Sequence, residues 1–270
     1  MVEENMRRKL IVGNWKMHGS RDQVSQLLGD IESGSERLLK DVEICVCPTY
    51  LHLGLAFDLL ASKSGVGKGQ IKLGAQNVHV EAAGAFTGEV SAHMLSEYGV
   101  SYVIVGHSER RQIFAESNQF VAEKFMAAQA SRLTPILCVG ESLDQRQDDE
   151  TERVVLNQLD DVITVAGIAA MKEAVIAYEP VWAIGTGKTA SPAQAQQVHR
   201  TLREHLDRLD PAIAKGMRII YGGSVKAANA KELFSQPDID GGLVGGASLE
   251  AEEFISICKS ADQELSLIHI

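Results

Sequence analysis

Hydrophobic positions in this chain fall in short continuous runs, separated by longer stretches in which apolar and charged residues recur every three or four positions. A run of about four to eight apolar residues without polar alternation is typical of a parallel strand covered on both faces. Eight such runs follow one another along the chain. They are KLIVGN (9–14), VEICVC (42–47), IKLGAQ (71–76), YVIVGH (102–107), TPILCV (134–139), AVIAYE (174–179), RIIYGG (218–223) and GGLVGG (241–246).

The stretches between these runs carry helix start signals. Ser20 with Gln23, and Ser191 with Gln194, have the spacing of a capping box, and Ser248 marks a third start. Eight strands, each followed by a helix, in about 250 residues predict an α/β fold, a single (β/α)8 TIM barrel.

The main alternative is a doubly wound open sheet. Such a sheet normally has Gly-x-Gly-x-x-Gly directly after its first strand, whereas here the first strand continues into NWKMHGS. The glycine cluster GVGKGQ at 65–70 follows a predicted helix and precedes a strand, which indicates a turn. No low-complexity linker divides the chain, so we expect one domain.

Composition limits the expected cellular location and binding partners of the protein. The chain has 270 residues, 45% of them hydrophobic, and a formal charge of −10, which disfavours nucleic acid as a partner. The start MVEENMRRKLIVG lacks the apolar run of a signal peptide, and no window approaches the ~18 apolar residues of a membrane span. We therefore expect a cytoplasmic protein that contacts no membrane. Its cysteines, which show neither metal-ligand nor disulfide spacing and should be reduced and mostly buried, are Cys45, Cys47, Cys138 and Cys258.

The stretch AYEPVWAIGTGKTASP (177–192) contains Gly-Lys-Thr, the last part of a nucleotide-binding P-loop. That motif needs a glycine five positions before Gly187, because the backbone must wrap around phosphate. Trp182 stands there instead. An indole cannot give the backbone that approach, so the stretch is not predicted to bind a nucleotide.

Polar residues gather where the predicted strands end, and barrels of this kind carry their chemistry there. Taken singly, each has an ordinary interpretation, such as a surface lysine, a structural histidine or a tight turn. Glu179 is the most informative, because a carboxylate that closes an apolar strand is costly to bury without a purpose. The loops after strands seven and eight are the usual phosphate site of this fold, which favours a phosphate ester as substrate. The strand-end residues are Asn14, Lys16, His107, Glu109, Glu179, Ser224, Gly245 and Gly246.

Six motifs spread over residues 7–260 carry a resemblance to a known family. In chain order they are NWK (14–16), GAFTGE (84–89), GHSERR (106–111), AYEPVWAIGTGKTA (177–190), YGGSV (221–225) and LVGGASL (243–249). Together they resemble the triosephosphate isomerase family. The resemblance implies a catalytic barrel over 7–260, with tails at 1–6 and 261–270 outside it.

The resemblance also implies the reaction and the catalytic roles. The family interconverts glyceraldehyde 3-phosphate and dihydroxyacetone phosphate through an enediolate, in glycolysis and gluconeogenesis, with no cofactor and no metal. Glu179 matches the base, His107 the electrophile, Lys16 the positive charge near the oxyanion, and Asn14 a further polar contact. We expect a lowered pKa and hence a neutral ring for His107, because the dipole of the helix that it begins opposes a cation. Glu109 matches a supporting position near Lys16 and His107.

Two loops have further implied roles. Residues 180–190 resemble the family's lid, in which Gly185 donates its backbone N–H to the substrate phosphate together with Ser224, Gly245 and Gly246. The loop around 77–90 resembles the segment that inserts beside the partner's active site, with Thr87 at its tip. The resemblance therefore implies a homodimer through this loop.

Three other functions compete with this one. A phosphate-sugar aldolase on the same barrel would need a Schiff-base lysine at the end of strand six, where this chain has Glu179. A nucleotide phosphohydrolase would need a glycine in place of Trp182. An inactive barrel kept as a binding scaffold would have lost at least one polar strand end, and none is lost.

Overall fold

The computed structural model describes residues 7–38, 40–63, 71–185 and 189–262. Eight parallel strands close into a barrel in which each strand pairs with the next along the chain and β8 pairs with β1. The sequence prediction of a (β/α)8 barrel is thereby confirmed. The strands are β1 (Lys9–Asn14), β2 (Val42–Cys47), β3 (Lys72–Ala75), β4 (Val100–Val105), β5 (Thr134–Val139), β6 (Val175–Tyr178), β7 (Arg218–Tyr221) and β8 (Gly241–Val244).

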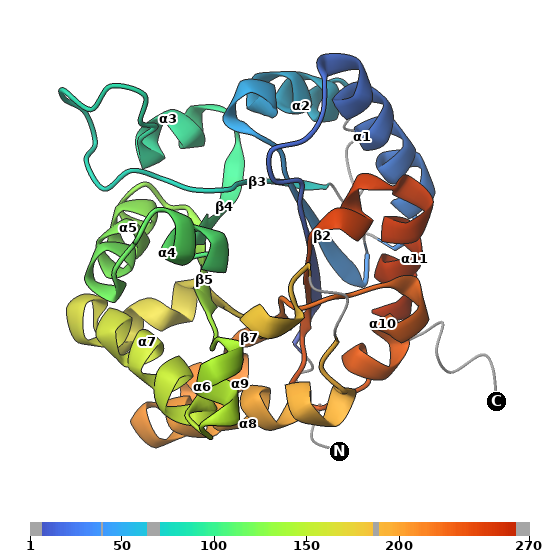
Figure 1. Cartoon of the computed structure of the whole chain (residues 1–270). Coiled ribbons are helices and arrows are strands. Elements are labelled where there is room, and N and C mark those ends of the chain that lie inside the picture. The colour runs from blue at the N-terminus through green and yellow to red at the C-terminus, as the bar shows by residue number, and fades with distance from the viewer. Residues whose placement is uncertain (1–6, 39, 64–70, 186–188, 263–270) are drawn as a thin grey trace.

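Helices surround the barrel as an outer ring (Figure 1). The α-helices are α1 (Arg21–Ser35), α2 (Tyr50–Lys63), α3 (Ala92–Glu97), α4 (Ser108–Ile113), α5 (Asn118–Ala130), α6 (Leu143–Gln147), α7 (Thr151–Ala166), α8 (Pro192–Leu209), α9 (Pro211–Gly216), α10 (Ala227–Phe234) and α11 (Ala251–Ser260). The described residues also form the 3-10 helices η1 (Ile168–Glu173), η2 (Val181–Ala183) and η3 (Gly246–Leu249), of which η2 and η3 follow the ends of β6 and β8.

Two of the three predicted helix starts are confirmed. Ser20 and Gln23 form a reciprocal capping box at α1, and Ser191 with Gln194 does the same at α8. Ser248 instead lies inside η3, where its hydroxyl donates to the carbonyl of Gly245 at 2.7 Å. Here a local hydrogen bond of the hydroxyl to nearby backbone replaces the N-cap role.

Apolar side chains fill two layers. One lies inside the barrel and the other between the strands and the helices, as the alternation of side chains along a strand requires. The four cysteines are free and buried, as predicted. The inner layer consists of Leu10, Val12, Cys45, Cys47, Tyr102, Ile104, Ile136, Cys138, Val175, Ala177, Ile220 and Leu243.

The amino-terminal end of the barrel is closed by a polar cluster. The hydroxyl of Tyr102 donates to Glu43 at 2.5 Å, and Arg218 donates to Glu43 at 3.0 Å and to the Tyr102 oxygen at 2.8 Å. These side chains lie near the starts of β2, β4 and β7, on the strand faces that also carry the inner layer, and Tyr102 belongs to that layer. An open, polar site can therefore form at the other end, where the strands finish.

Several observed strands end one or two residues before the predicted ones. The predicted runs reached His107, Glu179 and Gly223, whereas β4, β6 and β7 end at Val105, Tyr178 and Tyr221. The polar strand-end residues thus stand in the loops above the barrel.

The predicted turn at 65–70 lies outside the described residues. Within the described chain, no helix combines the length and hydropathy needed to span a membrane.

Candidate active site

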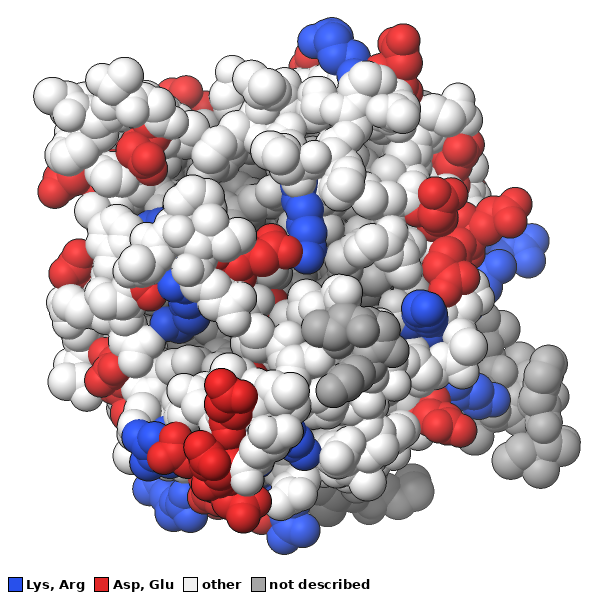
Figure 2. Space-filling view, viewed as in Figure 1, with Lys and Arg blue, Asp and Glu red and all other residues white. Residues whose placement is uncertain are grey.

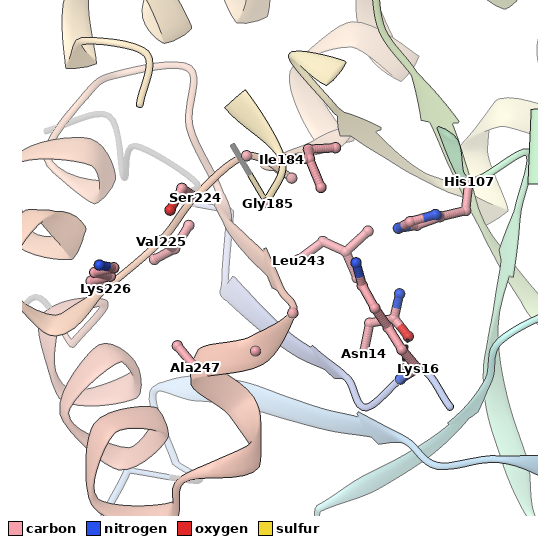
Figure 3. A pocket seen from close by; sticks show the side chains of 14 residues that line it. Asn14, Lys16, His107, Ile184, Gly185, Ser224, Val225, Lys226, Leu243 and Ala247 are labelled. Atoms are coloured by element: carbon pink, nitrogen blue, oxygen red, sulfur yellow. Dashed lines mark hydrogen bonds between the residues drawn. The ribbon is translucent and has the colours of Figure 1, made fainter. Parts of the chain in front are cut away.

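A cavity of about 250 Å³ opens at the carboxyl end of the barrel (Figure 3). Asn14, Lys16 and His107 lie at one end of it, and Ser224, Val225 and Lys226 lie at the other. Residues from five strand ends converge here, and seven of the ten predicted site residues are among them. The lining residues are Asn14, Lys16, His107, Ile184, Gly185, Gly222, Gly223, Ser224, Val225, Lys226, Leu243, Gly245, Gly246 and Ala247.

Lys16 is held by a constrained backbone. Its φ is +50°, in the left-handed region that a lysine rarely adopts, and such outliers persist only where the surroundings hold them. The side chain of Asn14 accepts the Lys16 N–H at 3.1 Å, and the amide of Gln76 donates to the Lys16 carbonyl at 2.8 Å. The same Gln76 amide group donates to Cys47 on β2 at 2.9 Å. The backbone of Lys16 is therefore tied to the ends of three strands.

Glu109 is the charge partner of Lys16. Its carboxylate lies 2.5 Å from the Lys16 ammonium and 3.7 Å from Nδ1 of His107. The supporting position implied for Glu109, near both residues, matches what the structure shows.

His107 joins β4 to α4 as the N-cap of that helix. Its Nδ1 accepts the backbone N–H of Glu109 at 3.2 Å. A neutral ring in this position carries its proton on Nε2, the nitrogen that lies 3.0 Å from the Glu179 carboxylate. The geometry thus places a proton donor, Nε2–H, next to a carboxylate.

Glu179 follows β6 directly and is 1% exposed. Its carboxylate accepts the backbone N–H of Ser108 at 2.9 Å and the Ser108 hydroxyl at 3.3 Å. Burial raises the pKa of this carboxyl, but the adjacent His107 and the N–H of Ser108 lower it, and the net direction is down. Glu179 is therefore a buried, ionised carboxylate.

The pKa of His107 differs from the sequence expectation. Burial lowers it, but the charge of Glu179 and the hydrogen bond to it raise it, and the net direction is up. The expectation of a lowered pKa, drawn from the helix start alone, is wrong for this arrangement. The helix start is present as predicted, but the sequence did not show that an ionised carboxylate would lie 3.0 Å from the ring.

The Glu179 carboxylate borders a second cavity, of about 220 Å³, together with Ser108, Cys138 and Gly140. It does not line the cavity that holds Asn14 and Lys16. The Glu179 carboxylate thus faces Ser108 and must turn to reach a molecule in the first cavity.

The other end of the first cavity is built from backbone. An added Cβ at Gly246 or Gly185 would meet no atom within 4 Å among the described residues, so these backbones face open space. Gly185 also has a φ of +68°, which favours glycine. Gly246 begins η3, and the amides at such a start are suited to bind an anion. Thr186, Gly187 and Lys188 of the predicted lid lie outside the described residues.

A model of the triosephosphate isomerase family matches residues 9–261. The chain belongs to the triosephosphate isomerase family.

Curated relatives match the sequence of this chain over nearly its whole length. A triosephosphate isomerase of Thiobacillus denitrificans is 57% identical over 256 residues, covering 95% of this chain and 99% of the relative. Those of Nitrosomonas europaea and Dechloromonas aromatica are 55% and 52% identical, covering 94% and 95% of this chain and 98% and 100% of the relatives. The predictions of this family and of an isomerase are confirmed.

Within this family framework, one predicted residue lies apart from the site. Thr87 is exposed in the loop between β3 and α3, which projects beyond the barrel (Figure 1), and it does not line the cavity of its own chain. Its implied role concerns the partner's site and remains a prediction.

Sequence reasoning missed three residues that the structure places at the site. Ser108 binds Glu179, Gln76 holds Lys16, and Cys138, interpreted only as core, borders the cavity behind Glu179. Ser108 lies inside GHSERR and Gln76 closes the run IKLGAQ. Extending the list of strand-end candidates to every polar residue at or just after a predicted strand would have included both.

Glu141 was also missed. It is fully buried after β5 and accepts hydrogen bonds from Trp182 at 2.9 Å, Tyr178 at 3.1 Å and Arg146 at 3.1 Å. These contacts anchor both sides of Glu179, since Tyr178 precedes it and Trp182 follows shortly after. Within the described residues, no group of three or more His, Cys, Asp or Glu side chains is placed to hold a metal ion.

Proposed function

We propose that this protein interconverts D-glyceraldehyde 3-phosphate and dihydroxyacetone phosphate through an enediolate. The observation that carries the proposal is the meeting of an ionised carboxylate, Glu179, with an imidazole, His107, beside a cavity whose far end is lined by glycine backbone. Family membership supports the same reaction.

Glu179 is the proposed base. It removes a proton from the carbon next to the carbonyl, the released electron pair forms the carbon–carbon double bond, and negative charge moves to the carbonyl oxygen. Returning the proton to the neighbouring carbon completes the isomerisation. One carboxylate can reach both carbons because the enediolate is planar.

His107 and Lys16 are the proposed partners of the oxygens. The Nε2–H of His107 can donate to the oxygen that becomes negative, and the ring can take the proton of the other hydroxyl. The Lys16 ammonium stabilises the same charge, and the buried side chain of Asn14, which is 5% exposed, adds a polar contact. Preorganised donors of this kind are worth about 3–4 kcal/mol at the transition state.

The proposed phosphate contacts are Ser224 and the backbone of Gly185, Gly245 and Gly246. All four line the cavity. Ser224 lies at the end away from His107 and Asn14 (Figure 3), whereas a Cβ added at Gly245 would lie 3.8 Å from the Lys16 ammonium. Phosphate binding there can hold the substrate so that its reacting carbons lie near Glu179, and binding energy far from the reacting carbons can then assist the proton transfer.

A phosphate-sugar aldolase is the nearest alternative on the same barrel. It would place a lysine at the end of β6, where the structure has Glu179 with Ser108 and His107 as partners. A coupled assay with glyceraldehyde 3-phosphate tests the isomerase directly. We expect turnover in the parent and a loss of at least about 10³-fold in Glu179→Gln, which keeps the shape but not the base. Turnover retained in Glu179→Gln would reject the proposed base.

The proposed assembly is a homodimer through the loop around 77–90. Exposed apolar side chains follow β1, β3 and β4, on neighbouring sides of the barrel, and interfaces commonly bury such surfaces. They are Met17 (91% exposed), Phe86 (42%), Ile113 (69%) and Phe114 (62%). The proposed role of Thr87 is to support the partner's site from this loop.

Sedimentation tests this assembly. Replacing Ala85, Phe86 and Thr87 with Gly-Ser-Gly should give a monomer of much lower activity. The same replacement at 148–150, an exposed to half-exposed turn, serves as the control and should leave a dimer. A fully active monomer would contradict the proposed role of the loop.

We also propose that the protein works in the cytoplasm, with triose phosphate as its ligand and neither nucleic acid nor membrane as a partner. The acidic composition supports the absence of a nucleic-acid partner.

A further inference from the structure

The cavity has two lysines at opposite ends. Lys16 lies near His107, and Lys226 lies beyond Ser224 and Val225 (Figure 3). Glycine backbone, Ser224 and apolar side chains form most of the wall between them. Charged side chains of this face lie mainly around its rim (Figure 2). Among the described residues that line the cavity, the side chains with a full charge at neutral pH belong to these two lysines.

The two lysines differ in their partners. The Lys16 ammonium is 2.5 Å from the Glu109 carboxylate, so its charge is largely compensated at long range. Among the described residues, no carboxylate lies within ion-pair distance of the Lys226 ammonium, and this side chain is exposed. A protein with a formal charge of −10 must attract an anionic substrate through local features of this kind.

The backbone around Lys226 is firmly held. The side chain of Asn229 accepts the Lys226 N–H at 2.8 Å and donates to the Ser224 carbonyl at 3.1 Å. The Glu253 carboxylate, from α11, accepts the N–H of Ala227 at 2.8 Å and is thereby directed to the start of α10. Ser224 and Lys226 are thus fixed relative to each other, on one rigid segment at the phosphate end of the cavity.

We propose that Lys226 is a further determinant of substrate affinity. It attracts the phosphate dianion and holds it from the solvent side, without taking part in the proton transfer. This inference rests on the proposed function for the identity of the anion. Because Lys226 lies at the end away from His107 and Asn14, its charge acts alike on bound substrate and transition state. It should therefore change KM, with little effect on kcat.

The test compares Lys226→Met with the parent at low and high NaCl. One exposed charge acting on a dianion across several ångströms of solvent is worth about threefold to tenfold in KM at low ionic strength, and most of this is lost at about 0.5 M salt. We expect that rise in KM, a kcat within about twofold, and convergence with the parent at high salt. Lys226→Arg should retain a parental KM, since it keeps the charge.

Lys231→Met is the matched control. Lys231 lies on α10, the helix whose N-cap is Lys226, is exposed and does not line the cavity. Its removal changes net charge equally and should leave KM unchanged. An unchanged KM in Lys226→Met, an equal rise in Lys231→Met, or a rise that salt does not reduce would each overturn the proposal.

Calorimetry with inorganic phosphate separates this proposal from the proposed function. If the parent fails to isomerise glyceraldehyde 3-phosphate, the proposed function fails. Phosphate binding can still be compared in the parent, Lys226→Met and Lys231→Met. Weaker binding in Lys226→Met alone, at low salt, supports the phosphate role of Lys226. Equal binding in all three proteins refutes it.

Discussion

Gly222 offers a test of how closely the position of Glu179 controls the rate. A Cβ added at Gly222 would lie 2.8 Å from Cγ of Glu179 and 3.2 Å from the carbonyl oxygen of Tyr178. The backbone of Gly222 cannot easily retreat, because its N–H donates to that same carbonyl at 2.7 Å. In Gly222→Ala the strain therefore falls on the Glu179 side chain.

The size of the effect follows from these distances. Carbon atoms pack best at about 3.5–4.0 Å, so Cγ of Glu179 must move by about 1 Å. A misplacement of that size in a reacting group can lower the rate about 10²-fold. Overpacking of a buried site costs about 1–3 kcal/mol in the free energy of unfolding. We expect kcat to fall about 10²-fold while the midpoint of thermal unfolding drops by a few degrees.

The coupled isomerase assay and a thermal melt measure both effects. Gly216→Ala is the control, because a Cβ there meets no described atom within 4 Å. The double variant Gly222→Ala/Glu179→Gln shows whether the alanine lowers kcat through Glu179. If the alanine acts through Glu179, adding it to Glu179→Gln should lower kcat little further. A folded Gly222→Ala protein with kcat within twofold of the parent would refute the reasoning.

Two further predictions concern the catalytic pair. Glu179→Asp should keep phosphate affinity but should lower kcat by about 10²-fold or more, because the carboxylate retreats by about one carbon–carbon bond. A kcat within a few-fold of the parent would remove Glu179 from the base role. Glu179→Gln should lower the pKa of His107, because the charge that raises it is removed while the burial that lowers it stays. Titration of the ring by NMR measures this, and an equal or higher pKa in the variant would contradict it.

The local pattern of the sequence was enough to predict the barrel and most of its site. Continuous apolar runs indicate strands buried on both faces, and eight of them alternating with helices leave few arrangements. The rule that strand ends carry the chemistry then selected Asn14, Lys16, His107 and Glu179 without any coordinates. The fold prediction was confirmed because it depends on residues close together along the chain; the catalytic roles of these four residues stay predictions.

The tertiary structure alone decided how these residues act on one another. The upward shift in the pKa of His107 comes from Glu179, 72 positions later in the chain, and the compensation of Lys16 comes from Glu109. Ser108 and Gln76 gain their roles only because closure of the barrel brings β3, β4 and β6 to the same opening. Coulomb and hydrogen-bond energies depend on distances of a few ångströms between groups. The sequence states which groups exist, and the folded chain determines those distances.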